Sequence, residues 1–320
     1  MLKMRLERPR MIGVFCLLFI LTNCINKYVL SVLKFTFPTI FQGWQTLVGA
    51  LVLHLLMLSG KLDFSLKTLN SLYICIFRED VALWLPSMFF FVGTIYAGSR
   101  ALASLPVPVF FAFQNLASVI SLTVDVILKS KVNVWSYIFN MALVVSSIGV
   151  AKTDPQNNTD GYFWVCYHVL SLGAYSTYQK LIKGRLKLRP AGRLYCNYVY
   201  SMILFAPASY FLGEALEASK FPHLYFAKFY ICCGLSGILG VFLSLVVIQL
   251  EPLLESSGIS LDFLSSAAKI ITSVLSLVIF PFTLTVPYVS WLAINLLASL
   301  FSEELLPLAH PSNSNVVENT

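Results

Sequence analysis

Ten long apolar stretches joined by short connections constrain this chain more than any other feature of its sequence. Each is close to the roughly 20 residues that a helix needs to cross a bilayer. Because lipid satisfies no backbone hydrogen bonds, such stretches should be helical. The chain of 320 residues is only 12% charged, against about 25% in soluble domains, so we expect an all-α membrane protein. The expected spans are 11–31, 37–59, 81–99, 104–128, 134–151, 161–181, 194–214, 226–250, 258–281 and 284–302.

The connections between these spans predict the orientation and the domain organisation. With the N-terminus in the cytosol, fourteen Lys and Arg residues fall on the cytosolic side and five on the other, in agreement with the positive-inside rule. Both terminal segments, 1–10 and 303–320, are then cytosolic. The regions 11–151 and 161–302 each hold five spans, and an odd number makes the second set enter from the opposite face. We therefore expect two inverted five-helix repeats, which in transporters place the substrate near the midplane.

The charged residues, the cysteines and the histidines argue against several classes of function. The net charge of +7 comes from basic residues clustered in the loops between spans, so we expect no nucleic-acid partner. The seven cysteines form no CxxC pair, and buried free cysteine usually packs as a small hydrophobic residue, so we expect no metal. The four histidines stand singly, and we find no pair of carboxylates placed for catalysis in the spans. We accordingly expect neither catalytic residues nor a cofactor, and hence no enzyme.

A polar stripe follows one face of the ninth expected span. Its members recur at helical steps of three and four, and Lys269 stands near the middle of the span. An ammonium group at that depth costs roughly 2.5 to 3.5 kcal/mol on insertion scales, so it should face water, an ion-pair partner or an anionic ligand. We favour the ligand, with the neighbouring serines lining its site. The stripe consists of Asp262, Ser265, Ser266, Lys269, Thr272, Ser273 and Ser276.

Other spans also carry polar groups in a chain that is otherwise very apolar. Asn26 and Lys27 end the first span, and Gln114 and Asn115 lie in the fourth. One such face could serve only hydrogen bonding between helices. Several of them are more simply explained by a shared hydrated cavity.

The loop after the fifth span contains a glycosylation sequon. Asn157-Asn158-Thr159 matches the N-x-T acceptor pattern, which modifies residues exposed to the secretory pathway. The expected topology places this loop on the lumenal side. We therefore expect a secretory-pathway membrane, with Asn157 as the candidate glycosylation site.

Several short motifs resemble those of the nucleotide-sugar transporters in the drug/metabolite transporter superfamily. The similarity is carried by Asn26-Lys27, Phe37-Pro38 and Gln45, and it continues along nearly the whole chain. In the Golgi GDP-mannose transporter branch, a Phe-Tyr-Asn-Asn motif stands where this chain has Tyr195-Cys196-Asn197-Tyr198. A Gly-Ala-Leu-Asn-Lys motif stands where this chain has Ser265-Ser266-Ala267-Ala268-Lys269. Related transporters often have Lys-Asn-Leu at Gln114-Asn115-Leu116.

The resemblance implies roles for these motif residues. Asn197 would meet the nucleotide base, on which Tyr195 or Tyr198 could stack, and Lys269 would meet the diphosphate or the sugar. A compact ammonium charge suits phosphate. The altered motifs favour a UDP-sugar such as UDP-N-acetylglucosamine over GDP-mannose.

The resemblance also implies a mechanism and a location. A cytosolic nucleotide sugar would exchange for a lumenal nucleoside monophosphate in a Golgi membrane, with the endoplasmic reticulum as the alternative. Three other readings stay open: a GDP-mannose transporter, a phosphorylated-metabolite or drug transporter of the same superfamily, and a non-transporting membrane scaffold. The oligomeric state is open between a monomer and a homodimer.

Overall fold

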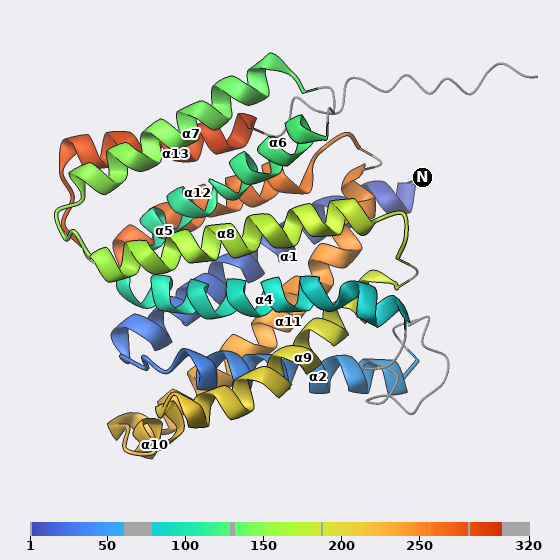
Figure 1. Cartoon of the computed structure of the whole chain (residues 1–320), viewed down its shortest axis with the longest axis vertical. Helices are drawn as coiled ribbons and strands as arrows, with labels where there is room; N and C mark the ends of the chain where they lie inside the picture. The colour runs from blue at the N-terminus through green and yellow to red at the C-terminus, as the bar shows by residue number, and fades with distance from the viewer. Residues whose placement is uncertain are drawn as a thin grey trace, which may run out of the picture.

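A computed structural model describes residues 2–60, 79–128, 132–186, 188–255, 257–280 and 282–302. Within these ranges every regular element is helical (Figure 1). Residues 303–320, expected as a cytosolic tail, lie outside the described part. The elements are α1 (Leu2–Lys27), the π-helical segment η1 (Tyr28–Val32), α2 (Pro38–Leu58), α4 (Glu79–Ser104), α5 (Val107–Gln114), α6 (Ala117–Ile127), α7 (Val134–Thr153), α8 (Thr159–Ile182), α9 (Pro190–Phe211), α10 (Glu214–Ala218), the 3-10 turn η2 (Pro222–Tyr225), α11 (Ala227–Glu255), α12 (Leu261–Ile279) and α13 (Val286–Phe301).

Length and apolar composition identify seven membrane-spanning candidates among the described helices. They are α1 with η1, α2, α4, α5 with α6, α7, α11 and α12. Helix α13 is apolar but shorter, and α8 and α9 carry more polar side chains. Large apolar side chains cover the outside of the molecule, including Val278 at 83% exposure and Val286 at 82%. Such a surface is suited to lipid, so the chain is a multi-pass membrane protein.

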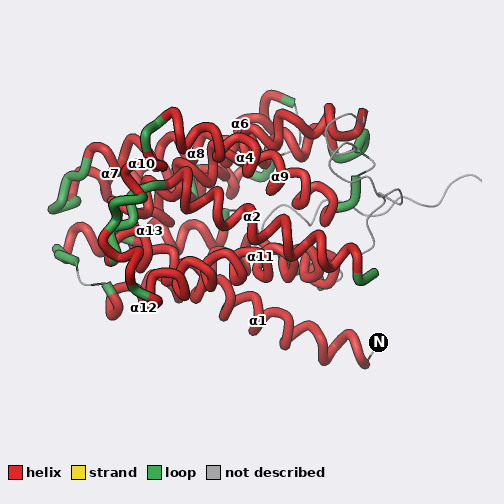
Figure 2. Tube along the Cα trace, turned by 90° about the horizontal axis from the view of Figure 1, so that it is seen from below, coloured by secondary structure: helices red, strands yellow, loops and turns green. Residues whose placement is uncertain are grey.

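The long helices lie side by side and run between two ends of the molecule (Figures 1 and 2). The N-terminus lies at one end, and the connection from α7 to α8 lies at the other (Figure 1). Helix α4 packs on α8, α2 on α9, α1 on α11 and α7 on α13. Small residues permit this close approach: a Cβ added to Gly149 of α7 would lie 2.3 Å from the Trp291 ring of α13.

Helix starts follow ordinary capping chemistry. Proline occupies the first turn of α2, α5, α9 and α13, where its missing N–H leaves no hydrogen bond unmade. The side chains of Asn133, Asn158 and Ser260 accept hydrogen bonds from first-turn N–H groups of α7, α8 and α12. The start of α12, which carries the polar stripe, is therefore fixed by its own sequence.

The fourth expected span differs from a continuous helix. It divides into α5 and α6 at a turn formed by Asn115 and Leu116. The N–H groups of Ser118 and Val119 bond to the carbonyls of Asn115 and Leu116, three residues back, at 3.2 and 3.1 Å. Residue spacing alone predicts no such break. Its consequence is that Asn115 lies at an irregular point in the middle of a span.

Candidate binding cavity

A cavity of about 350 Å³, lined mostly by polar residues, lies among α1, α5, α6, α8, α12 and α13. Its volume is at the lower end of the range for small-molecule sites. Five residues predicted for the site line it: Gln114, Asn115, Ser265, Ser266 and Lys269. The others in the lining are Phe19, Ala117, Ser118, Ser121, Leu172, Ser176, Lys180, Asp262, Ser299 and Ser302.

Helix α12 presents its predicted polar face to this cavity. Asp262, Ser265, Ser266 and Lys269 all belong to the lining. Ser266 is nearly buried, and its hydroxyl donates a hydrogen bond to the Ser299 carbonyl at 3.2 Å. The face therefore contributes both to the cavity and to packing on α13.

Lys269 belongs to a chain of hydrogen bonds that joins α12, the turn between α5 and α6, α13 and α7. Its Nζ donates to Asn115 Oδ1 at 2.9 Å. Asn115 Nδ2 donates in turn to Asn295 Oδ1 at 3.1 Å. The fully buried Asn295 completes the chain by donating through Nδ2 to the hydroxyls of Ser146 and Ser147, both at 2.9 Å. Because every link uses a side-chain amide, the network holds Asn115 in one orientation toward the lysine.

Asn295 is absent from the sequence-based site. The only signal for it was an isolated amide in the apolar segment 284–302. Buried polar groups in a span are normally hydrogen-bonded to another helix. That rule predicts that Asn295 has a partner without identifying Asn115.

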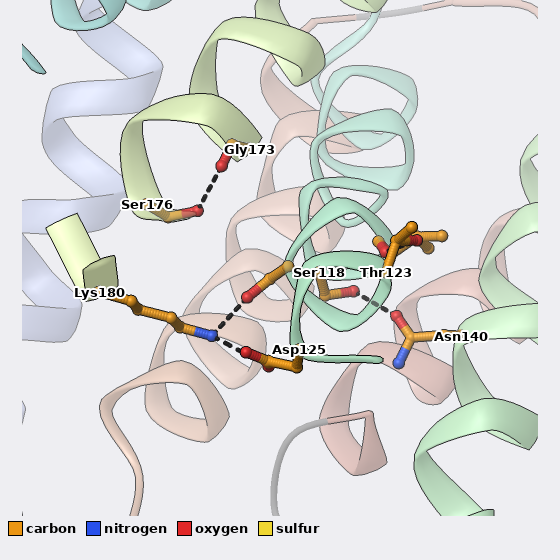
Figure 3. Close-up of polar contacts among 9 residues, drawn as sticks. Ser118, Thr123, Asp125, Asn140, Gly173, Ser176 and Lys180 are labelled. Atoms are coloured by element: carbon orange, nitrogen blue, oxygen red, sulfur yellow. Dashed lines mark hydrogen bonds and ion pairs between the residues drawn. The ribbon is translucent and has the colours of Figure 1, made fainter. Parts of the chain in front are cut away.

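A second lysine lines the cavity from α8. Figure 3 shows Lys180 reaching across to α6, where its Nζ lies 3.5 Å from Asp125 Oδ2. The same Nζ donates a hydrogen bond to the Ser121 hydroxyl. Ser118 lies one turn away on α6 and donates to Asn140 Oδ1 at 2.8 Å (Figure 3). Lys180 falls at the end of the expected span 161–181, and the spacing of polar residues does not assign it to the site.

The residues predicted to recognise the nucleotide base lie outside this cavity. Asn197 on α9 is buried; its Oδ1 accepts from Trp84 Nε1 at 2.8 Å, and its Nδ2 donates to the Tyr175 hydroxyl at 2.9 Å. Tyr195 and Tyr198 are buried in the same cluster of apolar side chains. Among the described residues, these three contribute to packing of α9 and not to the cavity lining. Their contact with a base stays a prediction.

The polar residues at the end of α1 also lie outside the main cavity. Asn26 Oδ1 accepts hydrogen bonds from Gln45 Nε2 at 3.1 Å and from Ser236 Oγ at 2.6 Å. Lys27 is 5% exposed, and its Nζ donates to the carbonyls of Leu102 and Leu105, both at 2.8 Å. These bonds satisfy the buried ammonium without an acid.

Lys27 also borders a smaller cavity of about 130 Å³. Gln156 and Phe282 also border this cavity, as does Ser276, which lies near the C-terminal end of α12. Helix α12 therefore lines the large cavity near its start and the small one near its end.

The helices and the cavity together define a multi-pass membrane protein with a lysine-bearing cavity among its helices. No family model matches the chain. It is 43% identical over 297 residues to the UDP-N-acetylglucosamine transporter TMEM241 homolog of Xenopus laevis, covering 92% of this chain and 95% of that protein. The UDP-N-acetylglucosamine transporter TMEM241 of Mus musculus is 38% identical, over 85% and 88%. The GDP-mannose transporter GONST1 of Arabidopsis thaliana is 24% identical, over 80% and 76%.

The chain therefore belongs to the nucleotide-sugar transporter family. The resemblance read from Asn26-Lys27, Phe37-Pro38 and Gln45 is confirmed by these relatives. The GDP-mannose transporters are its more distant relatives, in agreement with the altered motifs at Asn197 and Lys269.

Proposed function

We propose that this protein exchanges cytosolic UDP-N-acetylglucosamine for a lumenal nucleoside monophosphate, UMP. The observation that carries the proposal is the lysine-lined cavity, in a chain 43% identical to a protein named as a UDP-N-acetylglucosamine transporter. Both ligands are anions, so one cationic cavity serves the outward and the return step. A bound phosphate also lowers the cost of enclosing Lys269 in a low-dielectric site.

The ten helical segments form two inverted five-helix repeats in this proposal, 11–151 and 161–302. Exchange of equivalent helices would then pair α1 with α8, α2 with α9, α4 with α11, α5/α6 with α12, and α7 with α13. The observed packing follows this exchange: α2–α9, α5–α12 and α7–α13 map onto themselves, and α1–α11 maps onto α4–α8. The contact α11–α2 likewise maps onto α4–α9. This internal symmetry supports the repeat, and alternating access would be the rocking of one half against the other.

The cavity opens toward the cytosol in the proposed topology. Lys180 lies in the last turn of α8, which ends on the side of the molecule where the N-terminus lies (Figure 1). At the opposite end, Arg100 of α4 lies 3.6 Å from the buried Glu214, which also accepts hydrogen bonds from the backbone and side chain of Thr39. These contacts join α2, α4 and α10 and support a lumenal side that is closed in this conformation.

The proposed site of action is the Golgi membrane, with both termini in the cytosol and the connection from α7 to α8 in the lumen. Asn157 in that connection is exposed and has a φ of +41°, a conformation that Asn adopts more readily than most residues. Asn158 caps α8, so the sequon stands at the start of a helix. Asn157 is the proposed glycosylation site.

Ligand-induced stabilisation tests the proposed substrate. A ligand that binds only the folded state stabilises it by an amount that grows with its concentration over Kd. Purified protein should melt several degrees higher with UDP-N-acetylglucosamine and with UMP, and should respond less to GDP-mannose and to CMP-linked sugars at the same concentration. A larger shift with GDP-mannose would instead assign the protein to the alternative substrate.

A further inference from the structure

A second cation faces the cavity that contains Lys269. Lys180 lies in the last turn of α8, where the helix dipole favours positive charge. Its side chain is 57% exposed and lines the cavity. The two lysines approach from different helices, α8 and α12. A diphosphate has anionic oxygens on two phosphorus atoms, so it can be held from both sides.

In this conformation Lys180 forms an ion pair with a carboxylate. Asp125 and Ser121 lie four residues apart on α6 and so share one face of that helix. Asp125 is 27% exposed and lies 3.5 Å from the Lys180 ammonium (Figure 3). Ion pairs with this much exposure contribute about 0 to 1 kcal/mol, which makes the carboxylate easy to displace. A phosphate forms stronger, charge-assisted hydrogen bonds with an ammonium group.

The charges around the cavity explain why displacement of Asp125 from Lys180 would affect ligand binding. Lys180, Lys269 and Asp262 are in the lining, and Asp125 adds a second negative charge beside Lys180. The carboxylates and the lysines therefore balance before any ligand enters. An incoming diphosphate can interact fully with Lys180 only after the ion pair between Asp125 and Lys180 has separated.

We infer that Lys180 is a second phosphate-binding residue of this cavity and that Asp125 is an internal anion which the nucleotide sugar displaces. The inference rests on the proposed nucleotide-sugar transport and adds to it a residue that sets affinity. Asp125 competes with the ligand, so it weakens binding, while Lys180 strengthens it. A purely structural ion pair would act on stability and leave the affinity of the cavity unchanged.

Calorimetric titration of the purified full-length protein with UDP-N-acetylglucosamine, UMP and uridine tests this inference. Lys180→Gln should weaken binding of both phosphate-bearing ligands by about tenfold, because one charge-assisted contact is lost. Asp125→Asn should strengthen their binding by about threefold. In the double variant the Asp125 substitution should change affinity less than twofold, because its effect acts through Lys180. Uridine, which has no phosphate, should respond to none of these changes.

Two control variants and the wild type distinguish failure of the proposed transport function from failure of the inference about Lys180 and Asp125. Lys183→Ala removes an exposed lysine at the end of the same helix and should leave affinity unchanged. Lys180→Arg keeps the charge and should bind within about threefold of the wild type. If the glutamine variant does not fold, Asp125→Asn still tests the inference, because it leaves Lys180 in place. Wild-type protein that binds none of the phosphate-bearing ligands would overturn the proposed function itself. Wild-type binding with unchanged affinity in Lys180→Gln, or weaker binding in Asp125→Asn, would overturn only the inference about this pair.

Discussion

Replacement of Lys269 by alanine should lower nucleotide-sugar uptake at least about thirtyfold while the protein still folds and reaches its membrane. Thirtyfold corresponds to about 2 kcal/mol, within the range for a hydrogen bond to a charged group. The substitution removes a cation from the cavity and leaves Asn115 Oδ1 without the donor that lies 2.9 Å away. Uptake of labelled UDP-N-acetylglucosamine into vesicles containing equal amounts of each variant measures the effect.

Lys152→Ala is the matched control for this experiment. Lys152 is exposed in the last turn of α7 and lies outside the cavity lining, so its loss should leave uptake near the wild-type rate. A non-transporting scaffold would tolerate both substitutions equally. Normal uptake by the Lys269 variant would therefore remove the main argument that this cavity carries the substrate.

Substitution of Asn295 by leucine should destabilise the protein by about 2 kcal/mol and also reduce uptake. Hydrogen bonds between membrane helices contribute on average about 0.6 kcal/mol each. Asn295 accepts one from Asn115 and donates its two amide hydrogens to Ser146 and Ser147. The leucine side chain is similar in size but satisfies none of these groups. Without its partner, Asn115 no longer has a fixed orientation toward Lys269.

Thermal unfolding in detergent and vesicle uptake together check this prediction. Ser290→Ala is the control on the same helix. Ser290 is exposed, and within the described part of the chain its hydroxyl donates to the Val286 carbonyl of α13 at 2.9 Å. It should be close to the wild type in both measurements. An Asn295→Leu variant with unchanged melting temperature and uptake would show that the amide network does not organise the site.

The polar face of α12 could be predicted from sequence because it depends on one helix. The steps from Asp262 to Lys269 fix a common side without knowledge of any neighbour. The structure brings these residues to a cavity together with Gln114 and Asn115. The family could also be predicted, because the sequence contains short motifs that resemble those of the family, such as Asn26-Lys27 and Phe37-Pro38.

The remaining parts of the site depend on distances between helices, which a single sequence does not contain. Asn26, Lys27 and Asn197 have the polarity expected of ligand-binding residues, yet each is satisfied by a neighbouring helix. Lys180 and Asp125 come together only because α8 packs on α6. The break at Asn115 likewise depends on local backbone geometry that residue spacing does not reveal.

Exchange of UDP-N-acetylglucosamine for UMP can be measured in a reconstituted membrane. Purified protein would be reconstituted into proteoliposomes loaded with UMP or with buffer alone, and entry of labelled UDP-N-acetylglucosamine would be followed with time. We expect saturable uptake that is several-fold faster into the UMP-loaded vesicles and is reduced by unlabelled substrate. Uptake no greater than that of protein-free liposomes would contradict transport, and equal rates with and without UMP would contradict exchange.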